Sequence, residues 1–378
     1  MACASASPCV LARARAVAPR NAASRGTEPS SSGARGASPR SLGDRRAPWA
    51  RAASGGVDVS LSSTLPALKP WAEAKVQKCA GAWEKAAALA PNPPIAVVDL
   101  VPDEPSSPDG ALSGDVEPKK KKKKKGPFET EFGAFIYDKG YRQLFRALGY
   151  PGADAEAALA LERLNGCAAT DAPRDASSRV VLDVSCGPGI ITTRIAAGLR
   201  GYDALVASDV SEAMTKRAAE QLDTLAATTQ VLRAKSTRGD DDVSSDESSS
   251  APLPAFAAVR ADVCALPFAD ASVAAAHSSA GAHCWPDPPR GFAEIARVLK
   301  PGGVFVASTV VLAAPIRDKY VENGDAADAR AYRDGVWDVN TPFWDADAVV
   351  EMVRESGLVD VEVLREDKCF VMIAARKR

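Results

Sequence analysis

From residue 179 onward, short runs rich in β-branched residues alternate with longer segments of helical periodicity. Strands are expected over 179–184, 204–208, 257–260, 273–277 and 304–311, and helices over 190–199, 211–225 and 288–299. Such alternation is typical of a parallel sheet with helices on both faces. The sequence therefore predicts an α/β, doubly wound fold. Two further helical segments, 128–148 and 154–164, precede it.

A glycine-rich turn follows the first expected strand, within the run from Val180 to Ile190. Gly187 and Gly189 allow the backbone to approach a ligand closely, and the helix that opens next presents unpaired N–H groups. Asp209 ends the next strand, twenty residues after Gly189. A carboxylate there can accept both hydroxyls of a ribose. The alternative role for Asp209 is capping of the helix that begins near Ser211.

Two later signals follow the third expected strand. The first is Asp262-Val263, shortly before Leu266-Pro267-Phe268, and the second is the run from Arg297 to Gly303. The second combines a helix end, a tight turn and the start of a strand. Asp262 has two interpretations, a contact to a ligand or an acid that stabilises its own turn.

Taken together, these four features resemble the class I S-adenosylmethionine-dependent methyltransferases over about residues 128–375. Within that family the match is to a plastid-targeted plant and algal group related to the quinone-biosynthesis methyltransferases. It rests on Phe135 to Gln143, Asp183 to Gly189, and His283-Cys284-Trp285. The resemblance implies a Rossmann-like, mostly parallel sheet of seven strands in the order 3-2-1-4-5-7-6. Its last strand, at about 369–374, would be antiparallel.

The resemblance also implies a cofactor, S-adenosylmethionine, and a set of residues that hold it. The residues implied are Asp183, Ser185, Gly187 and Gly189 for the methionine part, Asp209 for the ribose, Asp262 and Val263 for the adenine, and Val210 as a further cofactor contact. Ser185 stands where many family members carry glycine.

The only two histidines of the chain, His277 and His283, fall at or just after the strand that borders the methyl group in this fold. Either could act as a base or orient the acceptor. The alternative is that His277 packs at the strand end and His283 orders the loop. Trp285 has two similar interpretations, an aromatic wall beside the sulfonium or a core residue. The apolar and aromatic content of 135–142 and 316–344 suggests a small, lipophilic acceptor.

Three other function classes compete with a small-molecule methyltransferase. A dehydrogenase is disfavoured because the turn lacks the third small residue of G-x-G-x-x-G and carries Pro188. A nucleic-acid methyltransferase is disfavoured because no N-P-P-[YF] motif is present. A cofactor-binding protein with a regulatory or assembly role, and weak or no catalysis, remains the alternative.

The N-terminal third differs in composition from the rest. Residues 1–55 are rich in Ala, Ser and Arg, with eight arginines and two acids between Met1 and Ala50. This predicts a plastid transit peptide, with an ordinary disordered tail as the alternative. Residues 56–126 are expected to be poorly ordered apart from a candidate helix over 68–89, and to end in a lysine-rich linker, 119–125. A solvated linker is favoured there over a nuclear import signal or a nucleic-acid patch, because no aromatic residues interleave with the lysines.

Residues 127–378 are then expected to form the methyltransferase domain, with 235–254 as a disordered acidic insertion. The net charge of −1 gives no indication of a nucleic-acid partner. No apolar run reaches 18 residues, so no membrane span is expected and peripheral membrane contact stays open. Eight cysteines without a C-x-x-C pair predict reduced thiols and no metal site. The expected partner is a small-molecule acceptor; the sequence does not indicate the oligomeric state.

Overall fold

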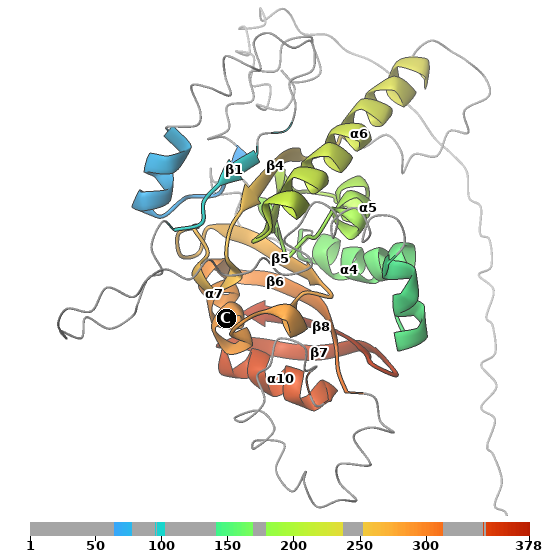
Figure 1. Ribbon diagram of the computed structural model, residues 1–378, viewed down its shortest axis with the longest axis vertical. Helices are drawn as coiled ribbons and strands as arrows, with labels where there is room; N and C mark the ends of the chain where they lie inside the picture. The colour runs from blue at the N-terminus through green and yellow to red at the C-terminus, as the bar shows by residue number, and fades with distance from the viewer. Residues whose placement is uncertain are drawn as a thin grey trace, which may run out of the picture. The chain divides into compact units, whose positions relative to one another are not determined.

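The computed structural model describes residues 64–77, 95, 97–102, 141–168, 179–236, 252–312, 343 and 345–378. They contain one eight-stranded sheet of order β1-β4-β3-β2-β5-β6-β8-β7 (Figure 1). The strands are β1 (Val97–Asp99), β2 (Val180–Val184), β3 (Ala204–Asp209), β4 (Ala255–Arg260), β5 (Val273–Ser279), β6 (Leu299–Val310), β7 (Leu358–Asp367) and β8 (Phe370–Lys377). The α-helices are α4 (Ala153–Ala168), α5 (Ile190–Gly198), α6 (Glu212–Ser236), α7 (Pro288–Val298) and α10 (Ala346–Glu355). Three 3-10 helices are η3 (Tyr141–Leu148), η5 (Val263–Ala265) and η6 (Ala282–Cys284).

The sheet is parallel except for β8, which runs antiparallel to both β6 and β7. Counted from β2, the order of seven strands is 3-2-1-4-5-7-6. The predicted fold class, strand order and antiparallel last strand are therefore confirmed. The last strand extends further than expected, to Lys377.

Helices cover both faces of this sheet, with α4, α5 and α6 on one side and α7 and α10 on the other (Figure 1). The central strands are correspondingly apolar, and all five residues of β2 are buried. Parallel strands that are covered on both faces have nearly continuous apolar sequences. The sequence pattern therefore predicts their positions.

Helix starts follow local chemistry. At α7, the Asp287 side chain accepts a hydrogen bond from the Arg290 N–H (3.1 Å), and proline occupies the first turn. At α10, Asp345 accepts from the Ala348 N–H (2.8 Å). An acidic N-cap satisfies an otherwise unpaired N–H and carries the favoured charge for that helix end.

The expectation of seven strands needs correction, because β1 is an eighth. It lies in the region predicted to be poorly ordered, yet it pairs in parallel with β4 from Val97–Ala258 to Asp99–Arg260. Residues 70–77 of the same region are helical. Leu68 forms an antiparallel bridge with Phe268. A three-residue strand is too short to show periodicity, so only its tertiary contacts reveal it.

Several other expectations fall partly or wholly outside the described residues. These are the transit peptide over 1–55, the lysine run 119–125, the first part of the helix predicted over 128–148, and most of the acidic insertion. Residues 141–148 form a 3-10 helix, and α6 continues past its predicted end at 225 to Ser236. Among the helices described, none has the length and apolar character needed to cross a membrane.

Candidate functional site

The carboxyl ends of β2, β3 and β4 meet at one edge of the sheet, and the glycine turn after β2 lies there. Gly187 and Gly189 have φ values of 56° and 90°, which favour glycine. A Cβ on Gly189 would lie 3.0 Å from Ala218 Cα of α6, so a side chain there would also require α6 to shift. A Cβ on Gly187 would meet nothing within 4 Å. The space beside Gly187 is thus open to a ligand that approaches the backbone.

Asp209, at the end of β3, contacts this turn directly. Its Oδ2 accepts the Gly187 N–H (3.0 Å), and its Oδ1 accepts the Ser211 N–H (2.8 Å). Ser211 Oγ in turn accepts the Met214 N–H (3.3 Å), so Ser211 caps α6 and Asp209 does not. Burial raises the pKa of the Asp209 carboxyl to about 6, against the opposing effect of the backbone N–H groups of Ser211, Gly187 and Val210. A perturbed carboxylate at a strand end is typical of a functional site.

The residues that follow the carboxyl ends of β3 and β4 differ in exposure. Val210 is 50% exposed, although it is large and apolar, so it presents an apolar side chain to solvent next to Asp209. Asp262, after β4, accepts the Cys264 N–H on Oδ1 (2.9 Å) and caps η5. Val263 is buried. The turn-stabilising role of Asp262 is therefore observed, and its contact to adenine stays a prediction.

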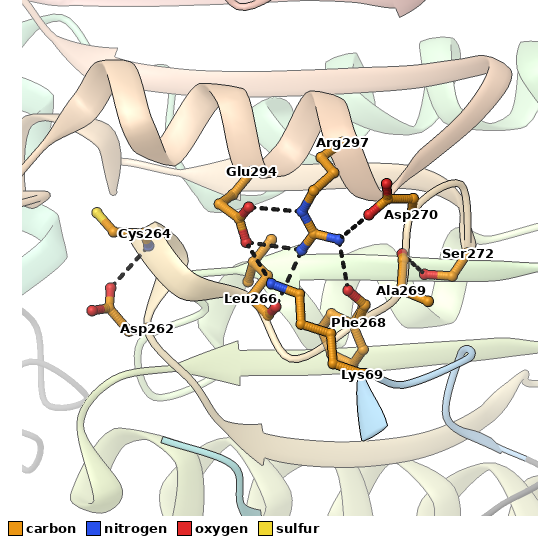
Figure 2. Close-up of polar contacts among 10 residues, drawn as sticks. All are labelled: Lys69, Asp262, Cys264, Leu266, Phe268, Ala269, Asp270, Ser272, Glu294 and Arg297. Atoms are coloured by element: carbon orange, nitrogen blue, oxygen red, sulfur yellow. Dashed lines mark hydrogen bonds and ion pairs between the residues drawn. The ribbon is translucent and has the colours of Figure 1, made fainter. Parts of the chain in front are cut away.

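The segment after η5 is held from α7 by Arg297 (Figure 2). Its Nε and Nη2 donate to the two oxygens of Glu294 (2.7 and 2.8 Å). Its Nη1 donates to Asp270 (2.7 Å) and to the Phe268 carbonyl (2.8 Å), and its Nη2 also reaches the Leu266 carbonyl (3.2 Å). The Arg297 of the predicted helix-end motif thus fixes the chain that follows Asp262, because a guanidinium directs its donors in a rigid fork.

Residues 182–307 match a family model described as a methyltransferase domain. An uncharacterized chloroplastic methyltransferase of Arabidopsis thaliana is 30% identical over 250 residues, which are 66% of this chain and 59% of that protein. A second protein of the same description and organism is 32% identical over 188 residues, 50% of this chain and 44% of that protein. The chain carries a class I S-adenosylmethionine-dependent methyltransferase domain.

The chain spans 59% and 44% of the lengths of these two relatives. Among solved structures, phosphoethanolamine N-methyltransferase 2 of Haemonchus contortus, in complex with S-adenosyl-L-methionine, is similar with a TM-score of 0.39 at 16% identity. That similarity covers 66% of this chain and 57% of the other. The family match begins in β2 and ends in β6, so it includes the glycine turn, Asp209 and Asp262 but not β1 or α4.

In this methyltransferase domain, Asp183 faces the protein interior. Its Oδ2 accepts from Thr192 Oγ1 (2.6 Å), and its Oδ1 lies 2.7 Å from His277 Nδ1. His277 is fully buried, and its Nε2 has no hydrogen-bond partner among the described residues. This geometry favours the packed interpretation of His277 over a base that reaches the acceptor. Asp183 likewise anchors the turn, since both of its oxygens already have partners.

His283 lies in the loop after β5 and is half-buried. Its backbone N–H donates to Thr309 Oγ1 (3.1 Å), and its Nδ1 lies 3.3 Å from the same oxygen. Burial lowers the pKa of His283 to about 4, so its imidazole is neutral at pH 7. A neutral ring beside the strand end retains the capacity to orient an acceptor, and this role stays a prediction.

Trp285 links the loop after β5 to the glycine turn. Its Nε1 donates to Ser185 Oγ (2.9 Å), and its ring packs edge-on against Phe292 of α7 at 5.0 Å. The side chain is buried, which favours the core interpretation. Ser185 has a φ of 55°, a strained value for serine, and the bond from Trp285 offsets that cost. A Cβ on Gly281 would lie 2.8 Å from Ser185 Cβ, so the two loops are in close contact.

Sequence reasoning did not single out Glu156 of α4, which is fully buried. Its Oε1 accepts from Ser279 Oγ (2.5 Å) and Ser308 Oγ (2.6 Å), at the carboxyl ends of β5 and β6. This contact fixes α4 over the part of the edge where the acceptor is expected. An acid on the apolar face of a helix was the signal that would have pointed to it.

Proposed function

We propose that this chain transfers a methyl group from S-adenosylmethionine to a small-molecule acceptor in the plastid. The observation that carries the proposal is the partly buried carboxylate of Asp209, held beside the open backbone of Gly187. An acid with a raised pKa is costly to keep ionised, and two ribose hydroxyls would supply the donors that lower this cost.

The proposed roles follow from this arrangement. Asp209 would hold the ribose, and the backbone at Gly187 and Gly189 would face the methionine part. Asp262 and Val263 would lie against the adenine, and Val210 would contact the cofactor beside Asp209. The bound cofactor supplies an electrophilic methyl group on sulfur, and the chain contributes alignment and exclusion of water. Such positioning is worth roughly 7–11 kcal/mol of barrier lowering.

Isothermal titration calorimetry of the full chain tests cofactor binding. We expect S-adenosylhomocysteine to bind with a Kd in the range of about 1–100 μM, equivalent to about 5–8 kcal/mol. NADH is the comparison ligand, and binding of NADH in place of S-adenosylhomocysteine would refute the proposal. Asp209→Ala should weaken binding about tenfold or more, by loss of charge-assisted hydrogen bonds. Asp347→Ala, an exposed acid in α10, is the matched control.

The acceptor is tested with methyl-labelled cofactor and a small-molecule extract of plastids. We expect a labelled product with the native chain, and markedly less of it with Asp209→Ala at a cofactor concentration near the native Kd. Intact cofactor binding without any labelled product would instead favour a regulatory or assembly role.

Two observations support the plastid. The N-terminal composition is that of a transit peptide, and both Arabidopsis relatives are named chloroplastic. A fluorescent reporter fused after residue 60 should enter plastids. A nuclear signal from the full chain would overturn this assignment and favour an import role for the lysine run 119–125.

A further inference from the structure

Strand β1 lies outside the family match and runs beside β4 (Figure 1). Because β1, β4 and β3 are parallel, the carboxyl end of β1 lies at the same end of the sheet as Asp209. Asp99 ends β1 opposite Arg260 of β4, and Arg260 lies opposite Asp209 of β3. Leu100 donates its N–H to the Arg260 carbonyl (2.8 Å) and is fully buried. Lys75 Nζ donates to the Val101 carbonyl (2.7 Å). The end of β1 is therefore fixed two strands away from the proposed ribose-binding acid.

Arg260 connects these strands through its side chain. Its Nη1 pairs with Asp99 Oδ2 (2.8 Å), and its Nε donates to the Val210 carbonyl (3.0 Å). The peptide group that carries this carbonyl also carries the Ser211 N–H, which donates to Asp209 Oδ1 (2.8 Å). A trans peptide points its C=O and N–H in opposite directions, so one rigid group transmits the position of Arg260 to Asp209.

We infer that Arg260 is a positioning residue for Asp209, and that β1 sets cofactor affinity through the Asp99–Arg260 pair. The inference rests on the proposed cofactor role of Asp209. Hydrogen bonds in a row polarise one another, so a cation on the carbonyl strengthens the N–H bond at the other end. A carboxylate that accepts hydrogen bonds from two hydroxyls must also be held within about 0.5 Å of its binding position.

The test is the affinity of the full chain for S-adenosylhomocysteine in three variants. Arg260→Met should weaken binding about fivefold, and Asp99→Asn about twofold to fourfold, the range of a solvent-accessible ion pair. Glu362→Gln is the matched control, because it breaks a pair of similar exposure far along the sheet. Side-chain exposures are 32% and 57% for Arg260 and Asp99, and 37% and 56% for Arg163 and Glu362. The control should leave the Kd unchanged.

Two further readouts separate positioning from general destabilisation. Asp99→Asn combined with Arg260→Met should bind no more weakly than Arg260→Met alone, since Asp99 acts through Arg260. The pH below which binding weakens should move upward in Arg260→Met, because the Ser211 N–H bond lowers the pKa of Asp209. The other ionisable groups that act on Asp209 (Asp183, Cys186 and Cys284) are unchanged in that variant.

The outcomes distinguish the two proposals. A native chain that does not bind S-adenosylhomocysteine would refute the cofactor proposal and this inference together. A native chain that binds, with Arg260→Met and Asp99→Asn both equal to the control, would overturn the inference alone. Weakening in Arg260→Met without any in Asp99→Asn would refute the role of β1.

Discussion

The charge on Asp209 should have opposite effects on folding and on cofactor binding. Burial raises the pKa of the Asp209 carboxyl from its usual 3.8 to about 6, and the charge of Asp183 adds to the rise. The folded chain therefore holds this proton more tightly than the unfolded chain, so ionisation lowers stability. A shift of about two units corresponds to about 3 kcal/mol.

The substitution Asp209→Asn removes this ionisation. Below pH 3.8, Asp209 is protonated in both states and contributes no pH dependence. Between 3.8 and 6 the unfolded chain loses the proton first, so the native chain becomes less stable relative to the variant as pH rises. Above about pH 6 the full difference of about 3 kcal/mol is present. An amide that faces the Gly187 N–H adds a constant cost of about 1–3 kcal/mol.

Urea denaturation of both chains without cofactor, from pH 4 to pH 7.5, measures this difference. Asp270→Asn is the control, because the hydrogen bond from Arg297 lowers the pKa of Asp270 below its usual value of 3.8. Asp270 is then ionised in the folded and unfolded chains over most of the range from pH 4 to pH 7.5, so the stability difference between the native chain and this variant should stay nearly constant. If the free energies of unfolding of the native chain and Asp209→Asn differed by the same amount at every pH, burial would not raise the pKa of Asp209.

Binding should change in the other direction. At pH 7.5 the Asp209→Asn variant should bind S-adenosylhomocysteine about tenfold more weakly, because two charge-assisted bonds to the ribose are lost. Affinity of the native chain should also fall as pH drops below about 6, where Asp209 is protonated. Calorimetry measures both effects, and equal affinities at pH 7.5 would remove the ribose assignment.

Three packing predictions use denaturation as the assay. Gly281→Ala should destabilise the fold by about 1–3 kcal/mol, because the alanine Cβ would lie 2.8 Å from Ser185 Cβ. An unchanged midpoint of denaturation would contradict this close contact. His277→Leu should lower the free energy of unfolding by about 3–5 kcal/mol, because it leaves the buried Asp183 without this partner. Adding Asp183→Asn should recover part of that loss. Losses that simply add in the double variant would argue against the pairing. Arg297→Met should lower the melting temperature by about 2–8 °C, because the hydrogen bonds of Arg297 to the Phe268 carbonyl and the Asp270 carboxylate are lost. An equal melting temperature would show that these hydrogen bonds contribute nothing to stability.

Local sequence was sufficient for the elements that form the centre of the sheet. Val180 to Val184 is a buried apolar run that ends at a glycine turn, and both properties are visible without knowledge of any partner. The order of acids at strand ends also follows from the chain, because parallel strands bring their carboxyl ends to one edge. Gly187, Asp209 and the start of α5 were predicted on that basis.

Tertiary structure alone decided which groups these residues contact. Asp183 meets His277, 94 residues away, and Asp99 meets Arg260, 161 residues away. No local periodicity encodes such pairs, since each depends on the register of strands that the chain brings together only when the core forms. The sequence determined where strands end and which of them carry acids. The packed sheet determined that Asp183 faces inward and that Asp209 stays at the carboxyl ends of the strands. It also determined that β1, from outside the matched domain, lies beside β4 and pairs with Arg260, the residue proposed to position Asp209.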